Sequence, residues 1–249
     1  MLKTVSFMKR VQFGRIMKMN EVTAVIVGRK ESQRIPKKVT QPFGDTTLLE
    51  LKIKQLQSCE RVDRIVVGSD CSNILAIAKE AGAETVVRPD YYCDEKVASA
   101  NEMISNMCSL IETDIVLWSH CTNPLLSPKT YDEFISLFFE KEKQNYDSVL
   151  SVDEVKEHLW DEKKTPFNYD PYAKKHPLAK TLSPLYKQNG GIFIQRHVSM
   201  KTNAYFFGKN PYIHLTPIEE SIDINTWYDF SIAEFLYKKG KQNEINEHI

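Results

Sequence analysis

Five cationic side chains crowd into one short segment, directly after an apolar run from Val22 to Val27. The segment reads Gly28-Arg29-Lys30-Glu31-Ser32-Gln33-Arg34-Ile35-Pro36-Lys37-Lys38. Arginine can donate two parallel hydrogen bonds to a phosphate, and lysine acts as a mobile point charge on the same oxygens. Such a loop can hold a nucleoside triphosphate, although a basic loop can also be a solvated turn. It is not a P-loop, because the pattern Gly-x-x-x-x-Gly-Lys-Ser/Thr is absent.

Polar residues also follow three later apolar runs. Asp70 comes after 62–69, Arg88 after 85–87 and His120 after 115–119. In open α/β sheets, ligands bind beyond the carboxyl ends of parallel strands, so these residues are expected at one rim with the basic loop. There His120 is either structural or in contact with substrate, as a base or as a cation. Cys121 is a weaker candidate nucleophile, because no partner base is evident.

The elements that would position these residues alternate along the chain. Apolar runs predict strands at 22–27, 62–69, 85–87, 115–119, 148–152, 191–195 and 205–215. Apolar periodicity predicts helices at 46–59, with Asp45 as N-cap, and at 74–81, 97–111, 131–143 and 227–238. This alternation predicts an α/β fold with a mainly parallel, doubly covered sheet.

Composition restricts the class of protein. The 33 basic and 33 acidic residues cancel, so no global field favours nucleic acid or membrane, and any anion site must be local. No run approaches the length of a membrane span, and the first 20 residues lack the apolar core of a signal peptide. Five scattered cysteines without a C-x-x-C pair argue against disulfides and zinc, which fits a reducing cytoplasm.

The chain is expected to form a single domain over residues 21–249, of 249 in all. Residues 1–20 are interpreted as a disordered, dispensable extension, with Met17 or Met19 as alternative starts. Residues 153–187 break the alternation, mixing lysines and prolines with aromatic residues. A connection of this length is usually functional or an interface.

The pattern Arg29-x-x-Ser32-x-Arg34-Ile35-Pro36-x-Lys38 resembles the signature of the sugar-activating cytidylyltransferases. These include the acylneuraminate and 3-deoxy-manno-octulosonate enzymes and spore-coat polysaccharide proteins of similar type. The resemblance runs from about Glu21 to the C-terminus and implies a Rossmann-like nucleotidyltransferase fold of the nucleotide-diphospho-sugar transferase type. It implies transfer of CMP from CTP to an acceptor oxygen, with pyrophosphate leaving. Arg29 and Lys38 would be catalytic, and the nucleotide would bind Gly28, Arg29, Ser32, Arg34, Lys38, Arg88 and Ser99.

A late segment, Asp223-Ile224-Asn225-Thr226, resembles the Asp-Ile-Asp-Thr motif with which the family holds a metal. Residues 223 and 225 of an extended segment point the same way, so both can reach one cation. Asp223 and Asn225 are therefore the predicted ligands of Mg²⁺, with Mn²⁺ as a substitute. Asn225 replaces a carboxylate, which should weaken the metal site. Asp223 is alternatively a helix N-cap, although Asn225 or Thr226 would cap more naturally.

Two further motifs imply an acceptor site and a partner. The segment Ser119-His120-Cys121-Thr122-Asn123-Pro124-Leu125 is similar to a family segment that carries Gln where this chain has His120. Lys187-Gln188-Asn189-Gly190-Gly191 resembles Arg-Pro-Asn-Gly-Ala. His120, Lys187 and Asn189 are thus expected to bind the acceptor. Family members insert an arm where this chain has 153–187, which implies a homodimer.

Three interpretations of the function stay open. The leading one is an enzyme that joins CMP to a small acidic acceptor, a nonulosonic or other sugar acid, for surface polysaccharide, capsule or glycan biosynthesis. Because Gln33, His120 and Lys187 depart from the sialic acid pattern, a phosphorylated or phosphonate acceptor is the second. Asn225 and Gln33 also depart from the family motifs, and the third interpretation is therefore a catalytically inactive nucleotide-binding subunit.

Overall fold

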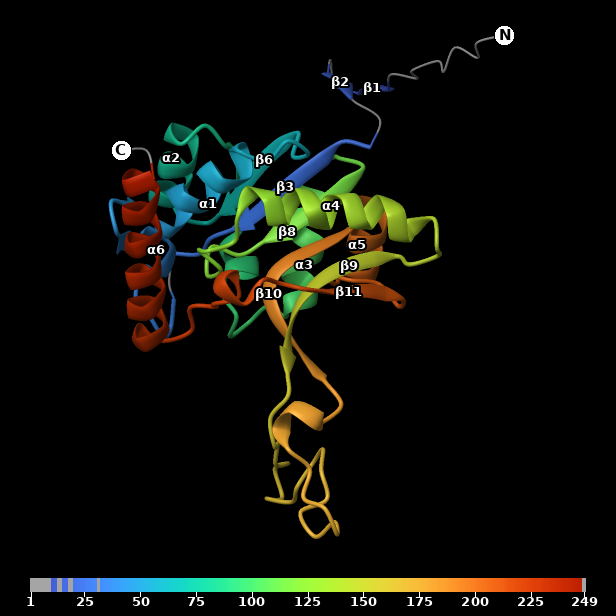
Figure 1. Ribbon diagram of the computed structural model, residues 1–249. Helices are drawn as coiled ribbons and strands as arrows, with labels where there is room; N and C mark the ends of the chain where they lie inside the picture. The colour runs from blue at the N-terminus through green and yellow to red at the C-terminus, as the bar shows by residue number, and fades with distance from the viewer. Residues whose placement is uncertain (1–9, 13–14, 18–19, 31, 248–249) are drawn as a thin grey trace.

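A seven-stranded sheet, in the order β11-β9-β10-β8-β3-β6-β7, forms the centre of the molecule (Figure 1). The computed structural model describes residues 10–12, 15–17, 20–30 and 32–247. The sheet strands are β3 (Val22–Val27), β6 (Arg64–Ser69), β7 (Glu84–Val87), β8 (Ile115–Ser119), β9 (Ser148–Val155), β10 (Leu185–Arg196) and β11 (Pro211–Leu215). Neighbours run parallel except at β10, which is antiparallel to β8 and β9. The predicted α/β fold with a mainly parallel sheet is confirmed.

Helices cover both faces of this sheet. One face packs against α1 (Leu48–Gln57), α2 (Ser72–Glu80), α4 (Pro128–Glu142) and α6 (Trp227–Glu247), and the other against α3 (Ala100–Ser109) and α5 (His197–Asn203). Alternation along β3 divides its side chains between the two cores, since Ala24 and Ile26 join the first and Val25 the second. The sheet is thus buried on both sides, as parallel sheets are.

Short elements complete the described chain. Two small hairpins pair antiparallel, β1 (Arg10–Gln12) with β2 (Arg15–Met17) and β4 (Pro42–Phe43) with β5 (Thr46–Thr47). Single 3-10 turns occur at η1 (Lys38–Thr40), η2 (Asp90–Cys93), η3 (Ala179–Thr181) and η4 (Ile218–Glu220). The first hairpin falls within the predicted extension, whose other residues up to 19 lie outside the described residues. No helix in the described chain is long and apolar enough to cross a membrane.

Two expectations about local structure were wrong, and one helix was not predicted. Helix α1 is capped by Thr47, whose Oγ1 accepts from Glu50 N while the Glu50 carboxylate accepts from Thr47 N. Asp45 instead accepts hydrogen bonds from the side chains of Tyr237 and Lys241. Helix α5 was not predicted, and the strand expected over 205–215 shortens to β11.

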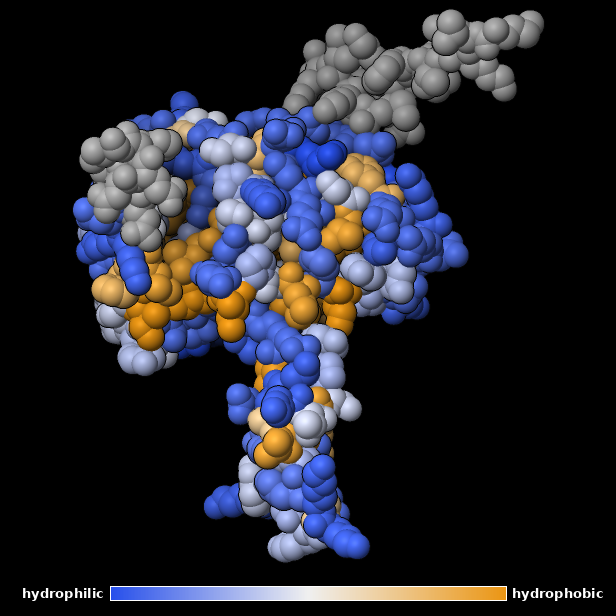
Figure 2. Space-filling view, in the orientation of Figure 1, coloured by the Kyte–Doolittle hydropathy of each residue, from blue (hydrophilic) through white to orange (hydrophobic). Residues whose placement is uncertain are grey.

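Residues 153–187 form an arm that leaves the body of the molecule (Figure 1). At its base β9 and β10 continue to pair beyond the sheet, with Leu185 opposite Val155. Its surface carries exposed apolar side chains, namely Trp160, Phe167, Tyr172 and Leu178. Figure 2 shows apolar surface on the arm and also on the body above it.

Candidate active site

A cavity of about 450 Å³ lies beyond the carboxyl ends of β3 and β8. It brings together seven of the predicted site residues: Gly28, Arg29, Ser32, Lys38, Arg88, Ser99 and His120. Its other walls include Val39, Tyr92, Cys93, Glu95, Met103, Cys121 and Thr122. The cavity is therefore at the rim where the strand order places ligands in open α/β sheets. Arg34, Lys187, Asn189, Asp223 and Asn225 do not line it.

The basic loop after β3 is fastened to the loop after β6. Gly28 N donates to Gly68 O at 3.0 Å, and Lys30 N donates to a carboxylate oxygen of Asp70 at 3.0 Å. A Cβ at position 28 would lie 3.1 Å from Ile74 Cγ2, so glycine allows this close approach. Asp70, which was expected at this rim, thus has a structural role in shaping the basic loop.

Lys38 lies where the basic loop meets the late segment of the chain. Its side chain is largely buried, and Nζ donates to Ile224 O at 2.8 Å. Burial, and then the positive charge of Arg34, lower the pKa of Lys38, while Asp223 acts in the opposite direction. Ile224 N in turn donates to Thr122 O at 2.8 Å. Three segments far apart in sequence therefore converge on one buried cation.

Arg29 forms an ion pair across the cavity with Glu95, at 2.5 Å between Nη1 and Oε2. A carboxylate and a phosphate oxygen engage a guanidinium in the same way, so Glu95 would compete with a phosphate for Arg29. Sequence reasoning missed Glu95. The only signal for it was its place in the loop between β7 and α3, at the same rim of the sheet.

Arg88 forms part of the cavity wall with a guanidinium that is almost fully buried. Its Nη2 donates to Tyr92 O at 2.8 Å and its Nε to Asn106 Oδ1 at 3.3 Å. Its stem passes under Gly68, where a Cβ would lie 2.7 Å from Arg88 Cδ. Burial lowers the pKa of Arg88. A fixed, partly desolvated donor of this kind suits a base carbonyl or a phosphate.

Ser99 reaches the cavity as the N-cap of α3. Its Oγ donates to a Glu102 carboxylate oxygen at 2.8 Å and accepts from Glu102 N at 3.2 Å. Because this capping box engages the hydroxyl, the structure favours a positioning role for Ser99 over direct contact with cytosine. The cap places the N-terminus of α3, with Ala100 and Met103, on the cavity wall, so the positive end of the helix dipole lies at the cavity.

The imidazole of His120 lies between the cavity and the sheet. Its Nδ1 is 2.7 Å from Gly190 O, and since a carbonyl only accepts, Nδ1 carries the proton. Burial lowers the pKa of His120 despite this hydrogen bond, and its ring packs against Phe193 and Phe206. The neutral ring then has Nε2 as an acceptor. This geometry favours a role for His120 as a base over a role as a cationic contact to the substrate.

Asn189 stabilises the irregular stretch of β10, where the register with β9 shifts between Gln188 and Phe193. Its Nδ2 donates to Asp153 and Thr216, and its Oδ1 accepts from Ser151 Oγ and Gly191 N. The bond from Gly191 N satisfies a backbone donor within the stretch where the register shifts. The Asn189 amide is buried and engaged on both sides, so the geometry favours a supporting role over the predicted contact with the acceptor.

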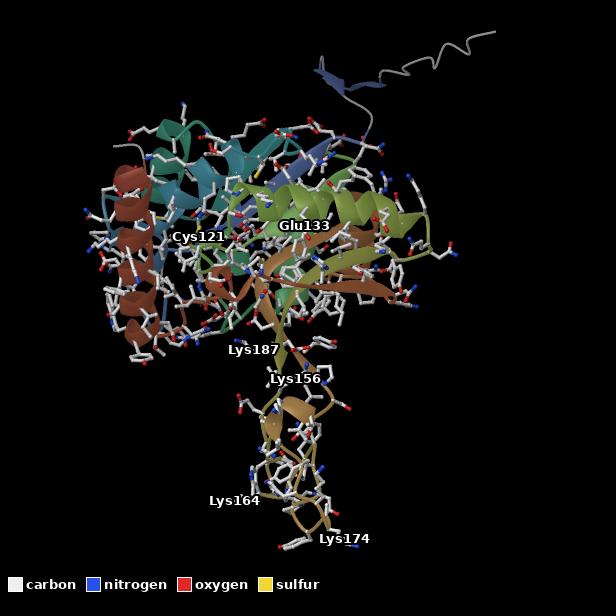
Figure 3. All side chains as sticks on the ribbon, viewed as in Figure 1. Cys121, Glu133, Lys156, Lys164, Lys174 and Lys187 are labelled. Atoms are coloured by element: carbon white, nitrogen blue, oxygen red, sulfur yellow. The ribbon has the colours of Figure 1, made fainter. Side chains whose placement is uncertain are left out.

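Lys187 and Arg34 also lie outside the cavity. Lys187 is exposed at the base of the arm, as Figure 3 shows, with Nζ 3.3 Å from Asp153 Oδ2. Arg34 is exposed on the basic loop, and its positive charge contributes to lowering the pKa of Lys38. Lys164 and Lys174 lie at the far end of the arm, so these two lysines are remote from the body of their own chain, whereas Lys156 lies nearer its base.

The predicted metal ligands contact each other. Asn225 Nδ2 donates to Asp223 Oδ2 at 2.6 Å, so the amide presents its nitrogen to the carboxylate. Thr226 caps α6 through Asp229, and Asp223 is not the N-cap. Within the described ranges, no group of three or more His, Cys, Asp and Glu could hold a metal. One carboxylate with substrate phosphates still fits Mg²⁺.

Comparison with known proteins identifies the family of the chain. A family model described as cytidylyltransferase matches residues 23–244. The chain is 26% identical over 234 residues to an N-acylneuraminate cytidylyltransferase of Escherichia coli, covering 91% of this chain and 54% of that protein. It is 22% identical over 228 residues to a pseudaminic acid cytidylyltransferase of Campylobacter jejuni, covering 88% of this chain and 97% of that protein. The chain thus spans about half the length of the first relative and nearly all of the second.

Among solved structures, the fold is similar to that of a CMP:2-keto-3-deoxy-manno-octonic acid synthetase in complex with CTP. The TM-score is 0.65 at 11% identity, over 88% of this chain and 99% of that one. This likeness concerns the fold alone.

Proposed function

The chain belongs to the cytidylyltransferase family, and we propose that it transfers CMP from CTP to a small sugar acid, releasing pyrophosphate. The observation that carries this proposal is the convergence of Arg29, Lys38 and Arg88 on one cavity at the carboxyl rim of the sheet. Three cations from separate segments suit a ligand with several phosphates.

The proposed reaction is attack by an acceptor oxygen on the α-phosphorus of CTP. Phosphoryl-type transfer depends mainly on positioning and on neutralising charge, which Arg29 and Lys38 provide. His120 Nε2 accepts the proton of the attacking hydroxyl. Cys121 is not the nucleophile, because burial raises the pKa of its thiol to about 12 and keeps it protonated.

Mg²⁺ is the proposed cofactor, and Mn²⁺ can replace it. Asp223 would hold it together with phosphate oxygens, and the metal supplies further neutralisation of the triphosphate. Asn225 donates to Asp223 and thereby fixes the orientation of that carboxylate.

The acceptor class is proposed from the relatives. They are named for N-acylneuraminate and pseudaminic acid, which supports a nonulosonic acid and a role in surface polysaccharide, capsule or glycan biosynthesis. The free cysteines of the described residues agree with a cytoplasmic enzyme. A phosphorylated or phosphonate acceptor remains the second candidate, since Lys187 gives a point charge rather than the planar fork that suits a carboxylate.

Pyrophosphate release with CTP and Mg²⁺ tests the function directly. The candidate acceptors to be assayed are nonulosonic and other sugar acids, including N-acetylneuraminate, and phosphorylated and phosphonate small acids. Turnover of a sugar acid supports the proposal, and N-acetylneuraminate itself is expected to be a poor substrate. Turnover of only a phosphorylated acid selects the second candidate. CTP binding without release of pyrophosphate from any acceptor indicates an inactive subunit.

The arm at 153–187 is the proposed dimer interface, supported by its exposed aromatic side chains. Light scattering is expected to give twice the chain mass of 28.8 kDa. Replacing 157–183 by a short glycine linker should give a soluble monomer that binds CTP but does not transfer CMP. A wild-type monomer at micromolar concentration would contradict the dimer.

The Arg29–Glu95 ion pair predicts that Glu95→Gln binds CTP more tightly. The substitution keeps the shape but removes a negative charge that competes with phosphate for Arg29. We expect the Kd for CTP to fall by up to about fivefold, since partly exposed ion pairs contribute about 1 kcal/mol or less. Isothermal titration measures this. Glu80→Gln, exposed on α2, is the control, and weaker CTP binding by Glu95→Gln would assign Glu95 a supporting role instead.

A further inference from the structure

A lysine lies in the core beside the cavity, outside the site described so far. Lys52 belongs to α1 and has no exposed surface. Lysine is almost never fully buried unless its ammonium group is paired, because desolvating the charge is unfavourable. In the described part of the chain, no carboxylate forms an ion pair with Lys52. Its burial therefore requires another explanation.

The ammonium group of Lys52 holds the loop that follows β8. Nζ donates to Asn123 O at 2.8 Å and to Tyr131 OH at 2.6 Å. Tyr131, buried on α4, lies 2.6 Å from Ser119 Oγ through the same hydroxyl. One turn along α1, Gln55 Nε2 donates to Pro124 O at 2.6 Å. The two ends of the loop 119–124 are thus fixed by hydrogen bonds from inside the core.

This loop carries groups of the candidate site. His120, Cys121 and Thr122 line the cavity. Thr122 O accepts from Ile224 N, next to Asp223, and Asn123 Nδ2 donates to Asn189 O at 3.0 Å. The position of Asn123 therefore influences both His120 and the segment of the proposed metal ligand.

The groups that face Lys52 cannot balance a full charge. They are Tyr131, Cys59, Cys121 and Glu220, and Glu220, the one carboxylate among them, acts most weakly on the pKa of Lys52. Burial raises the pKa of both thiols to about 12, so they are neutral, and burial lowers the pKa of Lys52 to about 7. A methionine would fill a similar volume without this penalty. Unlike methionine, the lysine can donate hydrogen bonds to Asn123 O and Tyr131 OH and thereby hold the loop 119–124.

We propose that Lys52 is a positioning residue of the transfer reaction, which holds the loop 119–124 so that His120 Nε2 faces the acceptor. The proposal rests on the proposed function for its kinetic consequence. Its structural consequence, the fixed orientation of the His120 ring, does not depend on activity.

The kinetic test compares Lys52→Met with Lys54→Met, an exposed position on the same helix. Lys52→Met should lower kcat by about 10- to 100-fold, because small displacements of a catalytic group have effects of this size. The Kd for CTP should stay within about twofold, because Arg29 and Lys38 lie on another loop. In a His120→Ala background, Lys52→Met should have little further effect. Additive losses, or an unchanged kcat in folded Lys52→Met, would overturn the proposal.

The structural test uses ¹⁵N–¹H spectra of the histidine side chains. The His120 Nδ1–H signal, assigned with His120→Ala, should shift or broaden in Lys52→Met and stay unchanged in Lys54→Met. An unchanged signal would refute the positioning role even if no acceptor is turned over, so failure of the proposed function remains distinguishable. If Lys52→Met does not fold, Tyr131→Phe replaces it, because it keeps the ring and removes only the hydroxyl. The same shift is then expected, and its absence counts against the proposal.

Discussion

Lys38→Ala is expected to lower kcat by about 10²-fold or more, the scale for losing one fixed contact to charge in a transition state. The side chain is largely buried, its Nζ is held 2.8 Å from Ile224 O, and its charge lies beside Arg29 and Arg34. A buried cation acts more strongly on phosphate than an exposed one, because less water screens it. Pyrophosphate release at saturating CTP measures the loss.

The matched control is Lys37→Ala, the exposed neighbour on the same loop, for which less than about a threefold change is expected. Arg29→Ala should resemble Lys38→Ala. Lys38→Arg should not restore turnover, because a planar guanidinium cannot replace a compact ammonium group against Ile224 O. Since burial lowers the pKa of Lys38 below its ordinary 10.5, activity should decline on the alkaline side before that value is reached. Full turnover by Lys38→Ala would remove the basic loop from the mechanism.

Local sequence was sufficient for the framework of the site. Strand β3 has the predicted bounds, because an apolar run between polar residues has no alternative to burial in the sheet. The rim then follows from topology, and it gathers Arg29, Arg88 and His120 as expected. The antiparallel course of β10 was not predictable, since periodicity carries no information on strand direction.

The errors concern polar side chains whose partners are set by tertiary structure. Asn189 satisfies a bulge, and no motif shows that geometry. The Ser99 cap was readable, because Ser99-x-x-Glu102 is a capping-box pattern, but the family motif was given priority over it. Glu95 reaches Arg29 over 66 residues, and Lys52 meets Asn123 over 71. A sequence pattern can place a residue at a rim, but it cannot tell whether its hydrogen bonds are already engaged.

Asp223→Ala is expected to abolish metal-dependent turnover. Asp223 supplies the one carboxylate of the predicted metal motif, so phosphate oxygens alone would have to bind the metal in its absence. Activity of the wild type should vanish in chelator and return with Mg²⁺ or Mn²⁺. The control is Glu219→Ala, an exposed acidic residue on η4, which should leave the metal titration unchanged. Undiminished wild-type activity in chelator would exclude the metal.

Asn225→Asp tests how the pair at 223 and 225 works. Asn225 Nδ2 now donates to Asp223 Oδ2 at 2.6 Å, so a second carboxylate would place two like charges in contact. Without metal this repulsion should lower the thermal stability of the variant, because neither carboxylate can donate. With Mg²⁺ the two carboxylates can share the cation, so half-maximal activity should occur at a lower Mg²⁺ concentration than in the wild type. Titrating turnover and melting temperature against free Mg²⁺ separates the two effects. A melting temperature that does not depend on Mg²⁺ in this variant would show that the cation binds elsewhere.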